Sequence, residues 1–259
     1  MIDLHSHILP GLDDGARDLE DSLEFARAAV AAGTTRIAAT PHADARYRVT
    51  ADERDAALAA LRQALEAESV PLEIIPGAEI ALDRYIDLDE AELARLRLGD
   101  GPYLLLESPL STAAGAFDRF LSGLLSRGVK MLIAHPERCP DFQRKPERLA
   151  ALVQGGALAQ VTAGSLAGRF GATVQAAALH MLEEGLVHDL CSDSHDATRR
   201  GPDLNEGLQV AERELPGSHA LADWLAVDVP HAIVTGAPIP RRPPVLLERR
   251  RRRGLFGRH

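Results

Sequence analysis

Short apolar runs alternate along this chain with longer segments whose apolar residues recur every three or four positions. The short runs are rich in leucine, isoleucine and valine, as in strands that are buried on both faces. The longer segments have the period of an amphipathic helix. Seven strands are therefore predicted, and they cover residues 2–4, 36–40, 72–76, 102–106, 130–134, 157–162 and 188–192.

Capping signals mark the helices between these strands. Thr50 is followed three residues later by Glu53, which is the pattern of a capping box at a helix start. The helical patterns end near glycines 33, 128, 155 and 185, as C-terminal glycines predict. The first two helices each carry one apolar face, formed by Leu19, Leu23, Ala26 and Val30 and by Leu58, Leu61 and Leu65.

Seven strand–helix alternations predict a single α/β domain, a barrel of parallel strands with helices outside. The length of 259 residues suits one such barrel. An open, doubly wound sheet has the same order of elements, and the strand pattern alone does not exclude it. The domain is predicted to span residues 1–237. Residues 238–259 form a Pro/Arg-rich basic tail with five consecutive arginines at 249–253, and this tail is predicted to be disordered.

The net charge of −9 conceals an asymmetry between these two parts. Residues 241–259 carry eight arginines and one glutamate, so the preceding residues carry a net charge of −16. An acidic body argues against a nucleic-acid partner and suits a site that collects cations. No apolar run approaches the roughly 20 residues of a membrane span, and no signal-peptide pattern is present, so a cytoplasmic location is predicted.

Histidines and carboxylates follow most of the predicted strands. The carboxyl ends of parallel strands share one rim, so these residues are expected to converge. In His5-Ser6-His7 both imidazoles lie on one face of an extended strand, because side chains repeat every two residues. The other strand ends carry Pro41-His42, Gly77-Ala78-Glu79, Glu107, His135-Pro136-Glu137-Arg138 and Asp193-Ser194-His195.

This combination of ligand types predicts a site for several metal ions. Histidine with carboxylate suits Mn²⁺, Fe or Zn²⁺. Glu79 and Glu107 are candidates to bridge ions about 3.5–4 Å apart, as in multi-metal hydrolases. The first loop, with Asp13-Asp14-Gly15, offers a further oxygen above the same rim. Each residue alone has an ordinary structural explanation, but six such strand ends in a chain with ten histidines do not.

The segments IDLHSHILPGLDDG, ATPH, GAEI, LLLE, IAHPER and SDSH resemble the PHP (polymerase and histidinol phosphatase) domain. They are most similar to its CpsB/CapC-type tyrosine-protein phosphatases of bacterial capsule and exopolysaccharide loci. The resemblance spans residues 1 to about 236 in one order. It implies a distorted (β/α)7 PHP-type barrel with three divalent metals, often manganese. Ala43 departs from the family, which often has a second polar residue after Thr-Pro-His.

The resemblance also implies roles for individual residues. Arg138 and Arg200 match phosphate-binding arginines of the family, although Arg199 beside Arg200 leaves that register open. The implied substrate is a phosphotyrosyl protein, in particular a membrane-associated bacterial tyrosine kinase that controls capsule or exopolysaccharide synthesis. The oligomeric state stays open, a homo-oligomer included. The implied metal ligands are His5, His7, Asp14, His42, Glu79, Glu107, His135, Asp193 and His195.

Several rival functions are weighed against this hypothesis. A cysteine-based tyrosine phosphatase needs Cys-x₅-Arg, but Lys145 and Ala197 stand at that distance from Cys139 and Cys191. An amidohydrolase would have a carboxylated lysine where Glu107 stands. A nuclease is disfavoured by the acidic body, and a non-catalytic kinase-binding protein by the nine intact ligands. A small-molecule phosphatase of the histidinol-phosphate type remains the alternative. The arginine-rich tail is a candidate for weak contact with an anionic membrane.

Overall fold

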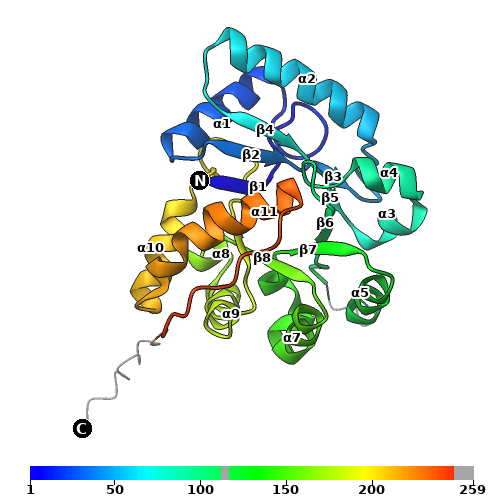
Figure 1. Ribbon diagram of the computed structural model, residues 1–259. Helices are drawn as coiled ribbons and strands as arrows, with labels where there is room; N and C mark the ends of the chain where they lie inside the picture. The colour runs from blue at the N-terminus through cyan, green and yellow to red at the C-terminus, as the bar shows by residue number, and fades with distance from the viewer. Residues whose placement is uncertain (112–116, 248–259) are drawn as a thin grey trace.

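The computed structural model describes residues 1–111 and 117–247. Parallel strands alternate with helices along the whole of this described part (Figure 1). The strands are β1 (Ile2–Ser6), β2 (Arg36–Ala39), β3 (His42–Ala43), β4 (Glu73–Pro76), β5 (Glu79–Ile80), β6 (Tyr103–Glu107), β7 (Lys130–Ala134), β8 (Leu158–Thr162) and β9 (Asp189–Cys191). The α-helices are α1 (Leu19–Ala31), α2 (Ala51–Ala67), α3 (Leu82–Asp87), α4 (Glu90–Arg95), α5 (Phe117–Ser126), α6 (Pro140–Arg144), α7 (Pro146–Gln154), α8 (Ala163–Leu166), α9 (Ala172–Glu183), α10 (Leu204–Glu214) and α11 (Val229–Thr235). Short 3-10 turns η1 (Pro136–Arg138) and η2 (Ser218–Leu221) and a π-helical turn η3 (Trp224–Asp228) complete the list.

The strands form a distorted, closed barrel. One sheet has the order β1-β2-β4 and the other the order β3-β5-β6-β7-β8-β9, and every pairing between these strands is parallel. The last strand returns to the first, where the amide of Asp193 donates to the carbonyl of His5 and the amide of His7 to that of Ser194, both at 2.9 Å. This closure confirms the barrel and excludes the open sheet.

Two of the seven predicted strands, 36–40 and 72–76, are each followed by a short second strand that the sequence did not predict. Strand β3 follows β2 after Pro41, and β5 follows β4 after Gly77. Proline has no amide hydrogen to continue the ladder. Gly77 leaves no room for a side chain, since a Cβ there would lie 2.8 Å from Leu98 and 3.0 Å from Thr40. The short strands β3 and β5 place His42 and Glu79 in the larger sheet rather than the smaller one.

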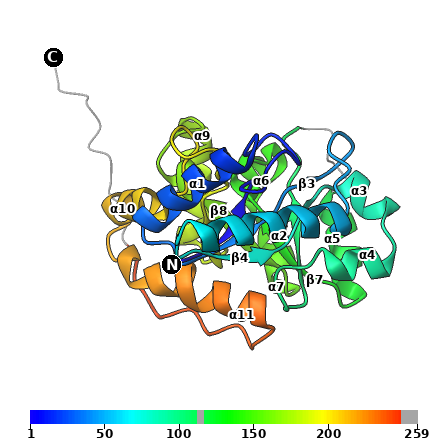
Figure 2. The same cartoon turned by 90° about the horizontal axis from the view of Figure 1, so that it is seen from above.

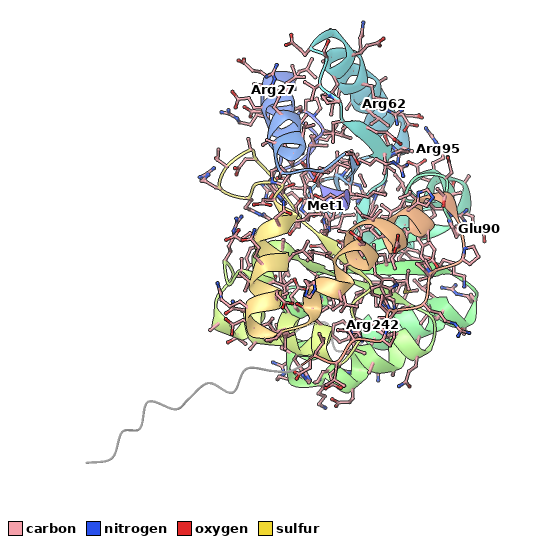
Figure 3. All side chains as sticks on the ribbon, turned by 60° about the vertical axis from the view of Figure 1, so that its left-hand side comes forward. Met1, Arg27, Arg62, Glu90, Arg95 and Arg242 are labelled. Atoms are coloured by element: carbon pink, nitrogen blue, oxygen red, sulfur yellow. The ribbon has the colours of Figure 1, made fainter. Side chains whose placement is uncertain are left out.

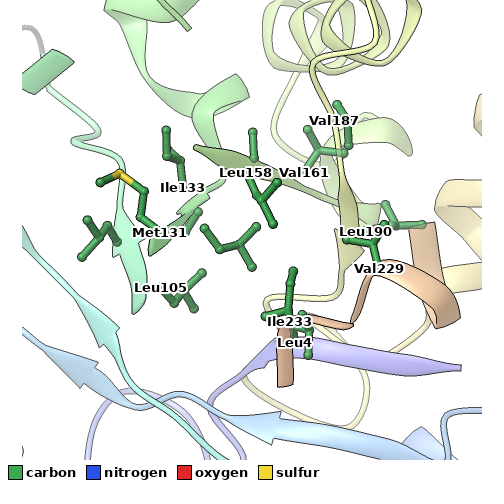
Figure 4. Packing of buried hydrophobic residues seen from close by; sticks show 14 of the residues in the cluster. Leu4, Leu105, Met131, Ile133, Leu158, Val161, Val187, Leu190, Val229 and Ile233 are labelled. Atoms are coloured by element: carbon green, nitrogen blue, oxygen red, sulfur yellow. The ribbon is translucent and has the colours of Figure 1, made fainter. Parts of the chain in front are cut away.

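Helices surround the barrel and one of them covers an end (Figures 1 and 2). Helix α11 ends beside Gly101, just before β6, where the amide of Asp100 donates to the Val234 carbonyl at 2.9 Å. It therefore lies at the amino ends of the strands, opposite the predicted metal rim. Its Val229 and Ile233 pack beside Leu4 and Leu190, as Figure 4 shows.

The capping box predicted for α2 is confirmed, because Thr50 and Glu53 cap each other as expected. Charged side chains cross between helices on the outside, for example Arg95, which reaches Asp52 and Asp55 at 2.7 and 2.9 Å (Figure 3). No helix among residues 1–111 and 117–247 has both the length and the apolar character to cross a membrane.

The first part of the predicted tail runs along the domain. The indole of Trp224 donates to the carbonyl of Pro240 at 3.0 Å, and Arg242 (Figure 3) donates to the carbonyl of Leu182 at 3.2 Å. Val245 and Leu247 pack against the core. These contacts attach residues 238–247 to the domain. The disorder predicted for 238–259 therefore does not hold for this first part of the tail. The five consecutive arginines lie outside the described residues.

Candidate metal centre

The first strand and the loop after it bring two histidines and two aspartates together. His5 and His7 are fully buried. The loop folds back so tightly that a Cβ on Gly15 would lie 2.0 Å from the His7 carbonyl oxygen. Asp13 thereby accepts from Nδ1 of His7 at 2.7 Å and from the backbone amide of His42 at 2.9 Å. This bond puts the proton of His7 on Nδ1 and leaves Nε2 free for a metal, a common arrangement around metal-binding histidines.

A buried relay orients His5 in the same way. The side-chain amide of Gln160 donates to Asp189 at 2.5 Å, so its oxygen faces Nδ1 of His5 at 3.0 Å. Since that oxygen only accepts, His5 carries its proton on Nδ1 and presents Nε2 to the rim. The residues come from β8, β9 and β1, and all three are fully buried.

Glu79 lies at the centre of the cluster. Its carboxylate oxygens are 2.7 Å from Nε2 of His135, 2.9 Å from Nδ1 of His42 and 3.2 Å from Nε2 of His5. Burial alone would raise the pKa of Glu79, but His5, when protonated, and the adjacent rings of His135 and His42 outweigh it. The pKa is held well below its ordinary value, so this carboxylate is ionised at neutral pH.

Asp193 is a second carboxylate that lies close to both histidines of the first strand. Its Oδ1 is 3.6 Å from Nε2 of His5 and 3.4 Å from Nε2 of His7. Burial raises the pKa of Asp193, but the positive charges of Arg138 and His5 outweigh it and hold it well below its usual range. Asp193 and His135 both have positive φ, 49° and 35°. Strain of this kind persists where the surrounding fold fixes the residue, and it is common in functional sites.

The remaining predicted ligands complete the rim. Asp14, whose side chain is 45% exposed, places Oδ1 3.5 Å from His42 and 3.4 Å from His195. His195 donates through Nδ1 to the Asp193 carbonyl at 3.1 Å, which leaves its Nε2 toward Asp14. Glu107 lies beside Glu79 and His42. Burial, with the negative charge of Glu79 added, raises the pKa of Glu107 to about 7.

All nine predicted ligands thus come together, in four overlapping groups whose donor atoms lie within 4.8 Å of one another. The donor set fits metal ions, because several of its buried atoms have no hydrogen bond among the described residues. These atoms are Nε2 of His5 and His7, Nδ1 of His42 and Oε2 of Glu79. Buried polar atoms are rarely left unsatisfied, and divalent ions bound to these groups would satisfy them. The four groups are His7, Asp14, His42 and His195; His5, His7 and Asp193; His5, Glu79 and His135; and His42, Glu79 and Glu107.

Two arginines converge on the same carboxylate oxygen of Asp193. Arg138 binds it through Nη2, and Arg200 binds it at 2.8 Å. Arg199 instead points outward, with a side chain that is 91% exposed and 3.8 Å from Asp196. The two guanidinium groups therefore form a positive edge beside the cluster, and Arg200 rather than Arg199 belongs to it.

The cysteines lie apart from this chemistry. Cys139 and Cys191 are both free and buried. Burial raises the pKa of each thiol. A nucleophilic cysteine needs a lowered pKa, so neither has the character of a catalytic thiolate.

Sequence reasoning missed the residues that orient the ligands. Gln160 is a polar residue in the middle of an apolar strand, and that signal was available. Asp13 was considered only as an oxygen donor, whereas the fold places it behind His7. Phe170, whose ring centre lies 3.9 Å from the guanidinium carbon of Arg138, had no sequence signal, since only the tertiary fold brings it to the arginines.

The fold and site define a class: an α/β barrel with a candidate centre for several metals and a paired-arginine edge that suits an anion. The chain belongs to the CpsB/CapC family of capsular polysaccharide synthesis, whose model matches residues 1–235. Tyrosine-protein phosphatase YwqE of Bacillus subtilis (strain 168) is 36% identical over 264 residues, which cover 99% of this chain and 100% of YwqE. Tyrosine-protein phosphatase CpsB of Streptococcus pneumoniae is 28% identical over 90% of this chain and 98% of CpsB.

A solved structure agrees with this assignment. It comes from work on YwqE and CpsB as unique metal-dependent tyrosine phosphatases, and it matches this chain with a TM-score of 0.83 at 36% identity. The match covers 96% of this chain and 100% of that one. The barrel and the order of its elements are therefore shared along nearly the whole chain.

Proposed function

We propose that this protein hydrolyses phosphotyrosine on proteins, with divalent metals held by the nine histidines and carboxylates of the rim. One observation carries the proposal: the nine side chains gather beside two arginines that share Asp193. Metal ions suit the ligands, and guanidinium groups suit the oxygens of a phosphate. The membership in a family with metal-dependent tyrosine phosphatases supports the same activity.

Different residues of the chain bind the phosphate and orient the metal ligands. Arg138 and Arg200 bind the phosphate oxygens and match the charge that they carry in the transition state. Asp13 and Gln160 fix the rings of His7 and His5, so that each presents Nε2 to the centre. The nine rim residues would hold divalent ions, which would supply Lewis-acid chemistry that lowers the pKa of bound water. A tyrosyl leaving group, with a pKa of about 10, needs less acid assistance than a serine alkoxide.

Manganese is the proposed metal, with iron or zinc as the other candidates. Imidazole and carboxylate ligands are compatible with all three. The test is to strip the protein of metal, reload it with Mn²⁺, Fe²⁺ or Zn²⁺, and measure turnover of a phosphotyrosyl peptide against histidinol phosphate. We expect the Mn²⁺ form to prefer the peptide. A higher kcat/KM for histidinol phosphate would replace the proposal by the small-molecule alternative.

The proposed protein substrate is a membrane-associated bacterial tyrosine kinase, and the tail offers a way to stay near it. The five arginines at 249–253 would contact anionic headgroups, at about 1 kcal/mol per basic residue near a charged surface. Truncation after Leu247 keeps the contacts of Arg242 and the core. We expect it to reduce binding to anionic vesicles and to leave aryl phosphate turnover unchanged. Equal vesicle binding by both forms would exclude this role for the tail.

A further inference from the structure

Phe170 is held beside the two phosphate-binding arginines by a tight turn. It lies between α8 and α9, and the turn has glycines with positive φ at 168 and 171. The amide of Arg169 donates to the carbonyl of Gly164 at 2.9 Å and closes the turn. A side chain on Gly164 would lie 3.2 Å from ring carbon Cε2 of Phe170. The ring is therefore set in place by its own backbone.

The ring of Phe170 faces the positive edge of the site. The guanidinium carbon of Arg138 lies 3.9 Å from its centre, and that of Arg200 lies 6.0 Å away. Both distances are within the range of a cation–π contact. Phe170 thus stands next to the groups that would hold the phosphate.

Part of this ring remains open to solvent. Phe170 is 38% exposed, although it is a large apolar side chain. It lines a cavity of about 150 Å³ together with Asp193 and Arg200. An exposed aromatic ring in such a cavity has apolar surface to offer a ligand whose charged end sits on the arginines.

We infer that Phe170 recognises the aromatic ring of the substrate. The inference rests on the proposed function and assigns its preference for aryl phosphates to one residue. In an aryl phosphate a single oxygen separates the ring from the phosphorus, so a phosphate on Arg138 and Arg200 brings its ring close to Phe170. Two rings in edge-to-face or offset contact attract each other beyond the effect of buried area. A phosphoserine has no ring to place there.

The test compares Phe170→Ala, Phe170→Tyr and Phe170→Trp with the wild-type metal-loaded protein. For Phe170→Ala we expect KM for a phosphotyrosyl peptide to rise about five- to tenfold, the effect of losing one aromatic pair. We expect kcat, and kcat/KM for the matching phosphoserine peptide, to stay within about twofold. The two aromatic variants should keep the wild-type KM.

Inorganic phosphate separates ring recognition from simple support of Arg138. It occupies the arginines and has no ring, so its inhibition constant should change less than about twofold in Phe170→Ala. Calorimetry with a peptide that carries a non-hydrolysable phosphonomethyl-phenylalanine should show the same loss of affinity as KM. If KM is unchanged, or if the phosphate inhibition constant rises by the same factor as KM, the inference is overturned.

Two further variants serve as matched tests. Gly164→Ala keeps Phe170, but the added methyl group displaces its ring. This variant should therefore also raise KM for the phosphotyrosyl peptide. Val227→Ala is the control, because Val227 is 37% exposed and belongs to η3 beside α11, away from the rim. Failure of the wild-type protein to hydrolyse the peptide would contradict the proposed function. If the wild type hydrolyses the peptide and Phe170→Ala has the same KM, only the role of Phe170 is contradicted.

Discussion

At one end of the barrel the strands finish in histidines and carboxylates, whereas at the other end they begin against the apolar helix α11. The rim gathers buried charges such as Glu79 and Asp193, which are costly to desolvate unless they are paired. It also holds His135 and Asp193 in left-handed backbone conformations. The α11 end instead buries Ile233 and Val229 completely. The comparison teaches that this fold separates the residues that stabilise it from the residues that react.

Removal of the metals from the rim should have the largest effect on activity. The ligands come from six different strand ends, so only the folded chain presents the centre. We expect a strong chelator to abolish phosphotyrosyl peptide turnover, and Mn²⁺ to restore it. The melting temperature should fall on chelation, because bound metal stabilises the native state. Turnover that persists in protein shown by elemental analysis to be metal-free would contradict the metal centre.

Arg138→Lys tests whether the rim is built for phosphate as well as for metal. Lysine keeps the charge but loses the planar pair of donors. The expected loss in kcat/KM corresponds to about 3–4 kcal/mol, or roughly 10²–10³ in rate. Arg200→Ala should behave similarly. Arg199→Ala is the matched control, since that side chain points to solvent. Full activity of Arg138→Lys with normal metal content would show that the phosphate does not bind at Arg138.

Ile233→Ala probes the opposite end of the barrel. Ile233 is fully buried, so truncation leaves a cavity and should lower the free energy of unfolding by about 2–5 kcal/mol. Urea titration measures this change. At a temperature where the variant is folded, its kcat/KM should equal that of the wild type. A tenfold drop in kcat/KM at full metal content would show that the two ends are not independent.

His188 gives the α11 end a pH dependence of its own. It precedes β9, its ring centre lies 5.9 Å from that of Trp224, and burial, with the charge of Arg242 added, lowers its pKa to about 4. Below pH 6.5 the unfolded chain binds a proton that the folded chain refuses, so stability should fall from pH 6.5 to about pH 4.

The expected loss over this range is about 1–3 kcal/mol. His188→Gln has no ionisable ring and should remove this part of the pH dependence. The measurement is the difference between the unfolding free energies of the two proteins across that range. The subtraction cancels the titration of groups that both proteins share. A constant difference would mean that His188 is accessible to protons in the folded protein.

The smallest effect is expected from the cysteines. Cys139 follows the turn η1 and Cys191 ends β9, so both lie near the rim without joining it. In a folded Cys139→Ala, Cys191→Ala double variant, kcat should stay within about threefold of the wild type, because neither thiol has a lowered pKa. Loss of all turnover at normal metal content would mean that the nucleophile is a thiolate.

The comparison of the two ends also shows how far sequence reasoning reached. Strand periodicity and glycine stops predicted the barrel, and residues that follow buried strands predicted the rim. The rule predicted that His42 and Glu79 lie at the rim, but not that they belong to short strands of a different sheet from β2 and β4. The pattern of apolar residues contains no information about such a change of sheet, because the residues on both sides of it are largely buried.

The sequence by itself determined the ligand types, their order and their common rim, because side-chain chemistry and strand period are local properties. It also predicted that Arg138 lies on that rim, because Arg138 follows His135 by three residues. Only the tertiary structure decided that Glu79 lies at the centre, that Asp13 and Gln160 orient His7 and His5, and that Arg200 rather than Arg199 turns inward. Each of these contacts, including that of Phe170, depends on how the barrel closes, and closure joins residues that are distant along the chain.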